Sequence, residues 1–162
     1  MKKIILFVLT MLLLCGCAGE ETMETVADEL VQPVMAQPRE IMVSLPGEVS
    51  VPTMEGDAGR VYLADDYEIC IQTMASGDLN ATVQTVTGYE KDALTVMNTK
   101  MDGLERYEFV WVSAGEKGER IGRGVVLDDG SYHYVMTVLR DADTTENSQI
   151  VWNDVFASFQ LV

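Results

Sequence analysis

Thiols and an imidazole are the side chains of this sequence that could carry nucleophilic chemistry, and there are few of them. The chain of 162 residues has three cysteines, Cys15, Cys17 and Cys70, and one histidine, His133. A serine or cysteine nucleophile needs a neighbouring base to take its proton, so any such pair would have to use His133. The sequence has no Gly-x-Ser-x-Gly segment, the turn that presents a nucleophilic serine in many hydrolases.

The only histidine lies in a segment whose pattern predicts a β-strand. Residues 131–139 alternate between two faces, and His133 shares its face with three further residues: Val135, Thr137 and Leu139. A strand histidine that packs beside a sheet explains this position better than a catalytic base does. We therefore expect no catalytic role for His133.

Cys70 also lies in an alternating segment, on the face opposite Ile69 and Ile71 and beside Glu68. A neighbouring carboxylate raises the pKa of a thiol and so lowers the fraction of reactive thiolate. We expect Cys70 to be a small, partly apolar filler and a poor nucleophile.

Metal ligands are equally sparse. A structural zinc site needs about four cysteine or histidine ligands, and beyond the leader the chain offers Cys17, Cys70 and His133. Alternating Asp141, Asp143 and Thr145 could supply oxygen ligands to Ca²⁺, but the glycine and the twelfth-position glutamate of an EF-hand are missing. We predict no metal, no cofactor and no catalytic residue.

Carboxylates leave one catalytic alternative open. Two carboxylates on either side of a glycosidic bond can act as acid and base, and four glutamates fall near one expected hairpin: Glu105, Glu108, Glu116 and Glu119. Acidic residues near strand edges more commonly face solvent and protect the edge. The alternative to a binding protein is therefore a small cell-envelope enzyme or enzyme inhibitor that uses surface carboxylates.

The first seventeen residues carry the strongest functional signal. Lys2 and Lys3 precede an apolar run over residues 4–14, which is too short to span a bilayer and is typical of a secretory signal peptide. The run ends in Leu14-Cys15-Gly16-Cys17, which resembles a bacterial lipobox, in which the last cysteine is acylated and becomes the mature N-terminus. A redox pair would need two residues between the cysteines, and here there is one.

The lipobox resemblance implies a signal peptide over residues 1–16 and a lipoprotein with acyl chains, such as palmitate, on Cys17. Two or three such chains anchor a protein stably to a membrane. We therefore expect an extracytoplasmic protein that is attached to the bacterial cell membrane through its N-terminal lipid.

The net negative charge of the chain limits the kinds of partner that it can bind. Loss of the leader removes Lys2 and Lys3, which leaves nine basic residues against 26 acidic ones and a formal charge of −17. This excess argues against nucleic acid and against direct binding to anionic lipid headgroups. The partners we expect, beyond the membrane itself, are an envelope protein or a small ligand.

Composition divides the mature chain into a tether and a domain. Residues 17–38 are acidic and lack aromatic residues, which indicates a flexible tether. All four prolines fall between residues 33 and 52, and the first aromatic residue after the leader is Tyr62. We therefore expect one domain over residues 39–162.

The elements of this domain follow from alternation and from turn residues. Asp78 and Gly88 are expected to begin and end a helix over residues 79–86, and Asp128-Asp129-Gly130 predicts a hairpin. A short helical piece is expected at 89–94, and a helix capped by Thr144 or Thr145 at 146–158. The expected strands are 40–45, 48–51, 60–63, 67–73, 95–100, 104–113, 120–127 and 131–139.

The terminal helix should be amphipathic, because Trp152, Phe156 and Phe159 recur at the spacing of one buried face. Trp111, Trp152 and Phe156 are candidate core residues or anchors for a partner. An antiparallel sheet packed against helices gives an α+β fold class.

The order of these elements resembles the PsbP-like fold. The segments that carry the resemblance are 106–111, 118–123, 128–134 and 152–159, and it extends over residues 39–162. The chain also resembles small uncharacterised lipoproteins of Gram-positive gut bacteria. The resemblance implies a non-enzymatic binding or assembly factor, and it supplies no functional residues to transfer. The expectation is thus a lipid-anchored, non-catalytic binding or assembly module.

Overall fold

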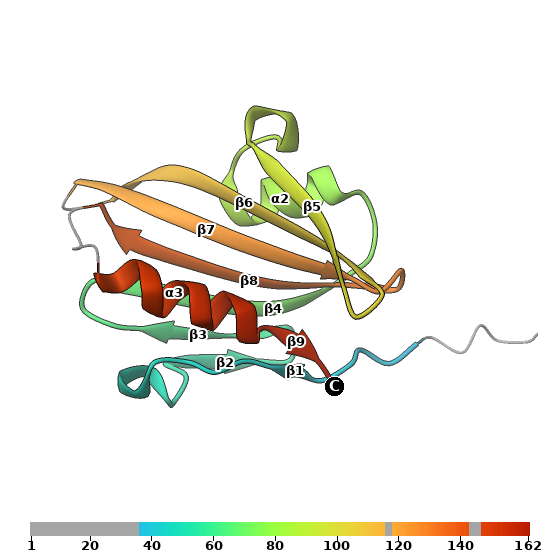
Figure 1. The fold of residues 1–162 in the computed structure, drawn as a ribbon, viewed down its shortest axis with the longest axis horizontal. Helices are drawn as coiled ribbons and strands as arrows, with labels where there is room; N and C mark the ends of the chain where they lie inside the picture. Colours follow the sequence, from blue (N-terminus) through green and yellow to red (C-terminus); the bar gives the residue numbers. More distant parts are fainter. Residues whose placement is uncertain (1–35, 116–117, 143–146) are drawn as a thin grey trace, which may run out of the picture. The chain divides into compact units, whose positions relative to one another are not determined.

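Seven antiparallel strands form the main sheet, in the order β2-β3-β4-β8-β7-β6-β5 (Figure 1). The computed structural model describes residues 36–115, 118–142 and 147–162, without the side chains of residues 147–151. The strands are β2 Met54–Gly56, β3 Gly59–Leu63, β4 Tyr67–Ala75, β5 Val96–Met101, β6 Leu104–Gly115, β7 Gly118–Asp128 and β8 Tyr132–Asp141.

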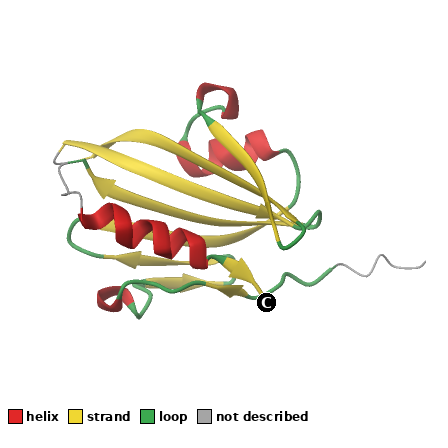
Figure 2. Ribbon diagram, in the orientation of Figure 1, coloured by secondary structure: helices red, strands yellow, loops and turns green. Residues whose placement is uncertain are grey.

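One α-helix of the described chain packs on each face of this sheet; both are among the red elements of Figure 2, which also include two short 3-10 helices. Helix α3, Asn147–Ser158, covers a core that includes Tyr67, Ile69, Met136 and Phe156. Helix α2, Leu79–Thr87, covers a smaller core on the opposite face, built on Val83, Phe109, Trp111, Val126 and Val135. The predicted α+β class, an antiparallel sheet packed against helices, is confirmed.

A second, two-stranded sheet joins the ends of the described unit. Strand β1, Ile41–Met42, pairs antiparallel with β9, Gln160–Leu161. The compact unit begins at Ala36, whose carbonyl accepts a hydrogen bond from the Tyr132 hydroxyl at 2.8 Å. The chain is thus in contact with the body of the unit before β1 starts.

The local signals at helix and hairpin ends are confirmed. The Asp78 carboxylate caps α2 by accepting a hydrogen bond from the Asn80 amide, and Gly88 ends the helix with a φ of 80°. Asp102 and Gly103 both have positive φ angles in the β5–β6 turn, as a tight hairpin requires. Gly130 has a φ of 87° in the β7–β8 turn.

Two predictions for the first part of the domain are wrong, and one strand there was not predicted. The segment predicted as a strand at 48–51 contains a 3-10 helix, η1 Gly47–Val49, which buries Val49. The strand predicted at 40–45 extends only over Ile41–Met42, because only these residues pair with β9. Strand β2 was not predicted; it is short and fully exposed, so it has no buried alternation to reveal it.

The later elements lie close to the predicted ranges. The short helical piece is a 3-10 helix, η2 Lys91–Ala93, and α3 begins within one residue of its predicted start. The proposed caps Thr144 and Thr145 lie outside the described residues, as do Cys17, the leader and the tether through residue 35. Within the described ranges, no helix is long and apolar enough to cross a membrane.

Candidate binding face

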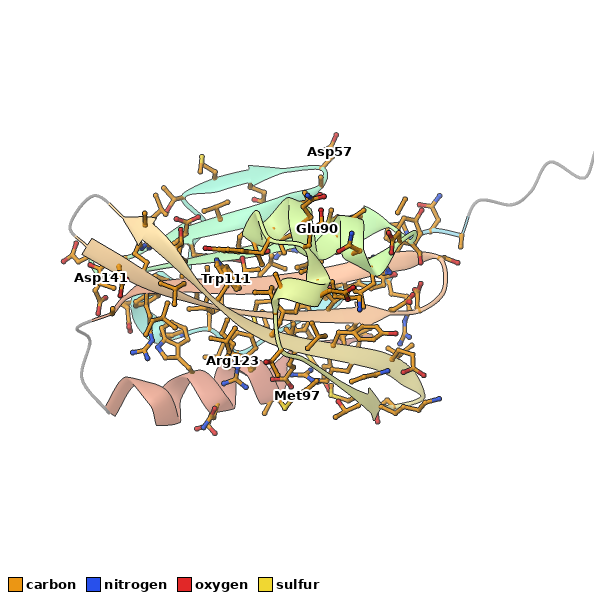
Figure 3. All side chains as sticks on the ribbon, turned by 90° about the horizontal axis from the view of Figure 1, so that it is seen from above. Asp57, Glu90, Met97, Trp111, Arg123 and Asp141 are labelled. Atoms are coloured by element: carbon orange, nitrogen blue, oxygen red, sulfur yellow. The ribbon has the colours of Figure 1, made fainter. Side chains whose placement is uncertain are left out.

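The sheet face that α3 covers remains partly open toward the β5 edge. Met97 on β5 and Val110 and Val112 on β6 project from this face and are 59%, 55% and 48% exposed. Figure 3 shows Met97 and Arg123 on the α3 side of the sheet and Trp111 on the other side. We call Met97, Val110 and Val112 the open strip.

Two adjoining hollows flank the open strip. The first, of about 220 Å³, lies between α3 and strands β6–β8, and the second, of about 570 Å³, lies against β5 and the segment before it. Val110 and Arg123 line both hollows. The two hollows and the strip thus form one continuous surface.

An arginine at the junction of the hollows is held from two directions. The Arg123 Nη1 donates to the Asn153 side-chain oxygen on α3 at 2.8 Å, and Nη2 donates to Glu108 Oε2 on β6 at 2.9 Å. Its guanidinium carbon lies 4.2 Å from the centroid of the Phe156 ring, in cation–π geometry. Sheet and helix together fix this side chain.

A second arginine lies deeper in the same network. Arg106 is buried, and its Nε donates to Glu108 Oε1 at 2.9 Å. Its Nη2 donates to the Phe156 carbonyl at 2.9 Å, near the C-terminal end of α3, where a positive charge is favourable. Burial acts to raise the pKa of Glu108, but the hydrogen bonds from Arg123 and Arg106 outweigh it and hold that pKa below its ordinary value.

Neither Arg106 nor Arg123 was singled out from the sequence. A signal was available, because Arg106 and Glu108 are two residues apart on a strand and must therefore share a face. The hydrogen bond between Arg123 on β7 and Glu108 on β6 could not be predicted from residue spacing, because it depends on which strands are neighbours in the sheet.

The three candidate anchors are core residues. Trp111 packs against Phe109 under α2, with ring centroids 5.9 Å apart. Trp152 meets the Tyr67 ring edge to face at 4.8 Å, and Phe156 lies beneath Arg123. Trp152 and Phe156 also line the first hollow, where Trp152 keeps 7% and Phe156 1% of its surface exposed.

His133 lies in a buried polar network, on the face that alternation predicts. Its Nδ1 lies 2.7 Å from the Thr82 hydroxyl oxygen, and its Nε2 lies 3.6 Å from Asp128 Oδ2. The order hydroxyl, imidazole, carboxylate matches a catalytic triad, but Thr82 and His133 are only 5% and 1% exposed. A substrate has no access to this hydroxyl, so the network joins α2 to β8 and β7.

Cys70 faces away from Ile69 and Ile71, as predicted, and is partly buried. Burial, together with the nearby Glu68 carboxylate, raises the pKa of its thiol. The thiol is therefore mostly protonated at neutral pH and is a weak nucleophile.

The glutamates considered for glycoside hydrolysis do not converge in the described part of the chain. Glu105 and Glu108 are three residues apart on β6 and so project from opposite faces. The hydrogen bond from Lys100 lowers the pKa of Glu105, and that of Glu108 is also lowered. A general acid needs a raised pKa. Glu119 is exposed, and Glu116 lies outside the described residues.

No group of three potential metal ligands occurs among the residues that the structure describes. Of the residues considered for Ca²⁺, Asp141 ends β8 and forms an ion pair with Arg120 at 3.4 Å. Asp143 and Thr145 lie outside the described ranges.

The Asp129 carboxylate stabilises the β7–β8 turn by accepting hydrogen bonds from the Ser131 and Tyr132 amides.

Comparisons with known proteins identify similar folds. No family model and no curated protein sequence matches the chain. The Ran-binding protein Mog1p of Saccharomyces cerevisiae is 13% identical over 75% of this chain and 90% of its own, with a TM-score of 0.52. At this identity, the likeness to Mog1p shows a shared fold alone.

Two further solved structures are similar to the chain at lower scores. CyanoP, the cyanobacterial PsbP of Synechocystis, is 16% identical over 70% of this chain and 80% of its own, with a TM-score of 0.49. The protein PA94 of Pseudomonas aeruginosa is 12% identical over 80% and 88% of the two chains, with a TM-score of 0.47.

Proposed function

We propose that this chain is a non-catalytic binding module, anchored outside the cytoplasm by a lipid on Cys17, and that it binds its partner on the open strip and the adjoining hollows. The observation that carries the proposal is the exposure of Met97, Val110 and Val112 beside two hollows. Contiguous exposed apolar side chains next to a polar rim are typical of binding sites.

The anchoring part of the proposal rests on the sequence. A basic start, a short apolar run and Leu14-Cys15-Gly16-Cys17 support export and acylation at Cys17. The partner is then an envelope protein or a small ligand, since a formal charge of −15 for the full chain disfavours nucleic acid.

Two finer features of the fold belong to the same proposal: a PsbP-like architecture and an amphipathic α3. The order of the strands and helices supports the first. Buried Trp152, Val155 and Phe156 beside exposed Asn153 and Asp154 support the second over the described half of the helix.

Site-specific photo-crosslinking in living cells tests the binding face. The photo-reactive amino acid p-benzoylphenylalanine is introduced in place of Val110 on the open strip or, as a matched control, in place of Leu63. Leu63 is 48% exposed on β3 and faces the other side of the sheet. After irradiation, mass spectrometry identifies protein and small-molecule adducts.

The proposal predicts a defined adduct at position 110 and none at position 63. The same adduct from both positions would indicate non-specific collision, and no adduct at position 110 would contradict the proposed face.

A further inference from the structure

The first hollow combines apolar walls with two arginine side chains. Its walls include five apolar side chains from α3 and the sheet: Val110, Ile121, Val138, Trp152 and Phe156. Among the residues whose side chains the structure describes, the polar groups in its lining are Arg123, Arg140 and Asn153, and none of the lining residues is acidic. Two guanidinium groups therefore line an otherwise apolar hollow in a chain with a formal charge of −15, and one of them, Arg123, is also paired with Glu108 at 2.9 Å.

Arg123 has hydrogen-bonding capacity to spare. A guanidinium has five N–H donors, and Arg123 uses one toward Asn153 and one toward Glu108. The other three have no hydrogen-bond partner among the described residues. The side chain is 32% exposed, and its position is fixed by Phe156 below it. Because the Arg123 side chain is already held in place, it can bind an anion without the entropic cost of ordering the side chain.

The volume of the hollow limits the size of the ligand. An apolar cavity of about 150 Å³ holds one benzene molecule, so about 220 Å³ holds a single ring with a short side chain. The apolar walls suit the ring, and the guanidinium suits a carboxylate, which can accept two parallel hydrogen bonds from it.

We propose that this hollow binds a small aryl-alkyl carboxylate, with the ring between Trp152 and Val110 and the carboxylate on Arg123. The inference rests on the proposed function, because the hollow is part of the same binding face. Beyond the proposed function, the inference assigns the ligand a negative charge, the size of a single ring with a short side chain, and Arg123 as its contact residue.

A nuclear magnetic resonance titration of the full chain in lipid nanodiscs tests this inference. The probe is 3-phenylpropionate, and its neutral amide, 3-phenylpropanamide, is the matched control ligand. The chain has only two tryptophans. Trp152 lines the hollow and Trp111 packs on the other face of the sheet, so their indole N–H signals report on-site and off-site effects in one spectrum.

We expect 3-phenylpropionate to shift the Trp152 signal in a saturable manner and to leave the Trp111 signal unchanged. The amide should bind about ten-fold more weakly, because it cannot form charge-assisted hydrogen bonds. Arg123→Gln should weaken binding of the carboxylate about ten-fold. The control Arg60→Gln, which removes an exposed charge on β3, should have no effect.

A second variant covers the case in which Arg123→Gln disturbs folding through its contact with Phe156. Val110→Asp keeps Arg123 and adds a repelling charge at the exposed rim, so it should also abolish the shift of the Trp152 signal. Equal affinity for acid and amide, or no saturable shift at Trp152, would overturn the ligand class. The photo-crosslinks at position 110 would then show whether the binding face itself remains valid.

Discussion

At the scale of single residues, the stability of the candidate binding face depends on one carboxylate. Glu108 accepts hydrogen bonds from buried Arg106 and from Arg123, both at 2.9 Å. Without Glu108, the Arg106 guanidinium would keep its two carbonyl partners near the end of α3 but would lose its counter-ion. A buried charge without a counter-ion is strongly destabilising.

We predict that Glu108→Ala lowers the free energy of unfolding by about 3–5 kcal/mol, the usual cost of removing one partner of a buried ion pair. Glu105→Ala is the matched control, because Glu105 is on the same strand and pairs with the exposed Lys100 at 2.9 Å. The control should change stability little, as exposed ion pairs usually do. Urea unfolding measures both, and equal losses would contradict the assigned role of Glu108.

The lowered pKa of Glu108 predicts a pH dependence. A carboxyl group whose pKa is lower in the folded state stabilises the fold above its unfolded pKa of about 4.3, and this contribution is lost as the pH falls through the folded pKa. Glu108→Gln should therefore be less stable than wild type at neutral pH, and the difference should shrink below about pH 4.3. A difference in the urea midpoint that stays constant from neutral to acid pH would contradict this prediction.

Residue-level chemistry was only partly predictable from the sequence. The face of His133 and the weak reactivity of Cys70 followed from alternation and from neighbouring charge. The spacing of Arg106 and Glu108 puts them on one face, but it does not show that Arg106 is buried, because a buried arginine on a strand has the same local pattern as an exposed one. Its burial becomes visible only when α3 is placed over β6 and β7.

At the scale of elements, two glycines on β7 make room for two aromatic rings on β6. Gly122 pairs with Trp111 and Gly124 pairs with Phe109 in the β6–β7 register. A side-chain carbon at Gly124 would lie 2.5 Å from the Phe109 ring, and one at Gly122 would overlap the Trp111 ring. The rings therefore lie over the backbone of β7, where any larger residue would displace them.

We expect Gly122→Ala to reduce stability by about 1–3 kcal/mol through overpacking. Gly56→Ala on strand β2 is the control, since a side-chain carbon there meets nothing within 4 Å. Thermal unfolding, followed by tryptophan fluorescence, compares the two. A melting temperature for Gly122→Ala equal to that of the control would show that Trp111 can move without cost.

Elements with strong local signals were predictable, and pairing between distant strands was not. The Asp129-Gly130 turn and the Asp78 and Gly88 caps are signalled by residue types that have few alternatives. In contrast, the pairing of β4 with β8 joins segments about 65 residues apart.

At the scale of the whole molecule, the proposed function needs both a lipid on Cys17 and a binding face on the domain. We predict that Cys17→Ser abolishes acylation, because the thiol is the acceptor, and that it leaves the protein unprocessed or releases it from its lipid anchor. Labelling of cells with a clickable palmitate analogue, followed by high-salt membrane fractionation, measures both effects. Cys70→Ser is the control and should remain acylated and membrane-bound. Acylation of Cys17→Ser would contradict the anchoring site.

The most direct test of the binding face compares two methionines that are almost equally exposed in the structure. Met97 on the open strip is 59% exposed, and Met54, on the opposite edge of the sheet, is 58% exposed. Both should oxidise at similar rates in the purified protein when treated with dilute hydrogen peroxide. In intact cells, we predict that Met97 is protected relative to Met54, because a bound partner covers the open strip. Equal oxidation of the two methionines in cells would contradict the proposal that this face binds a partner.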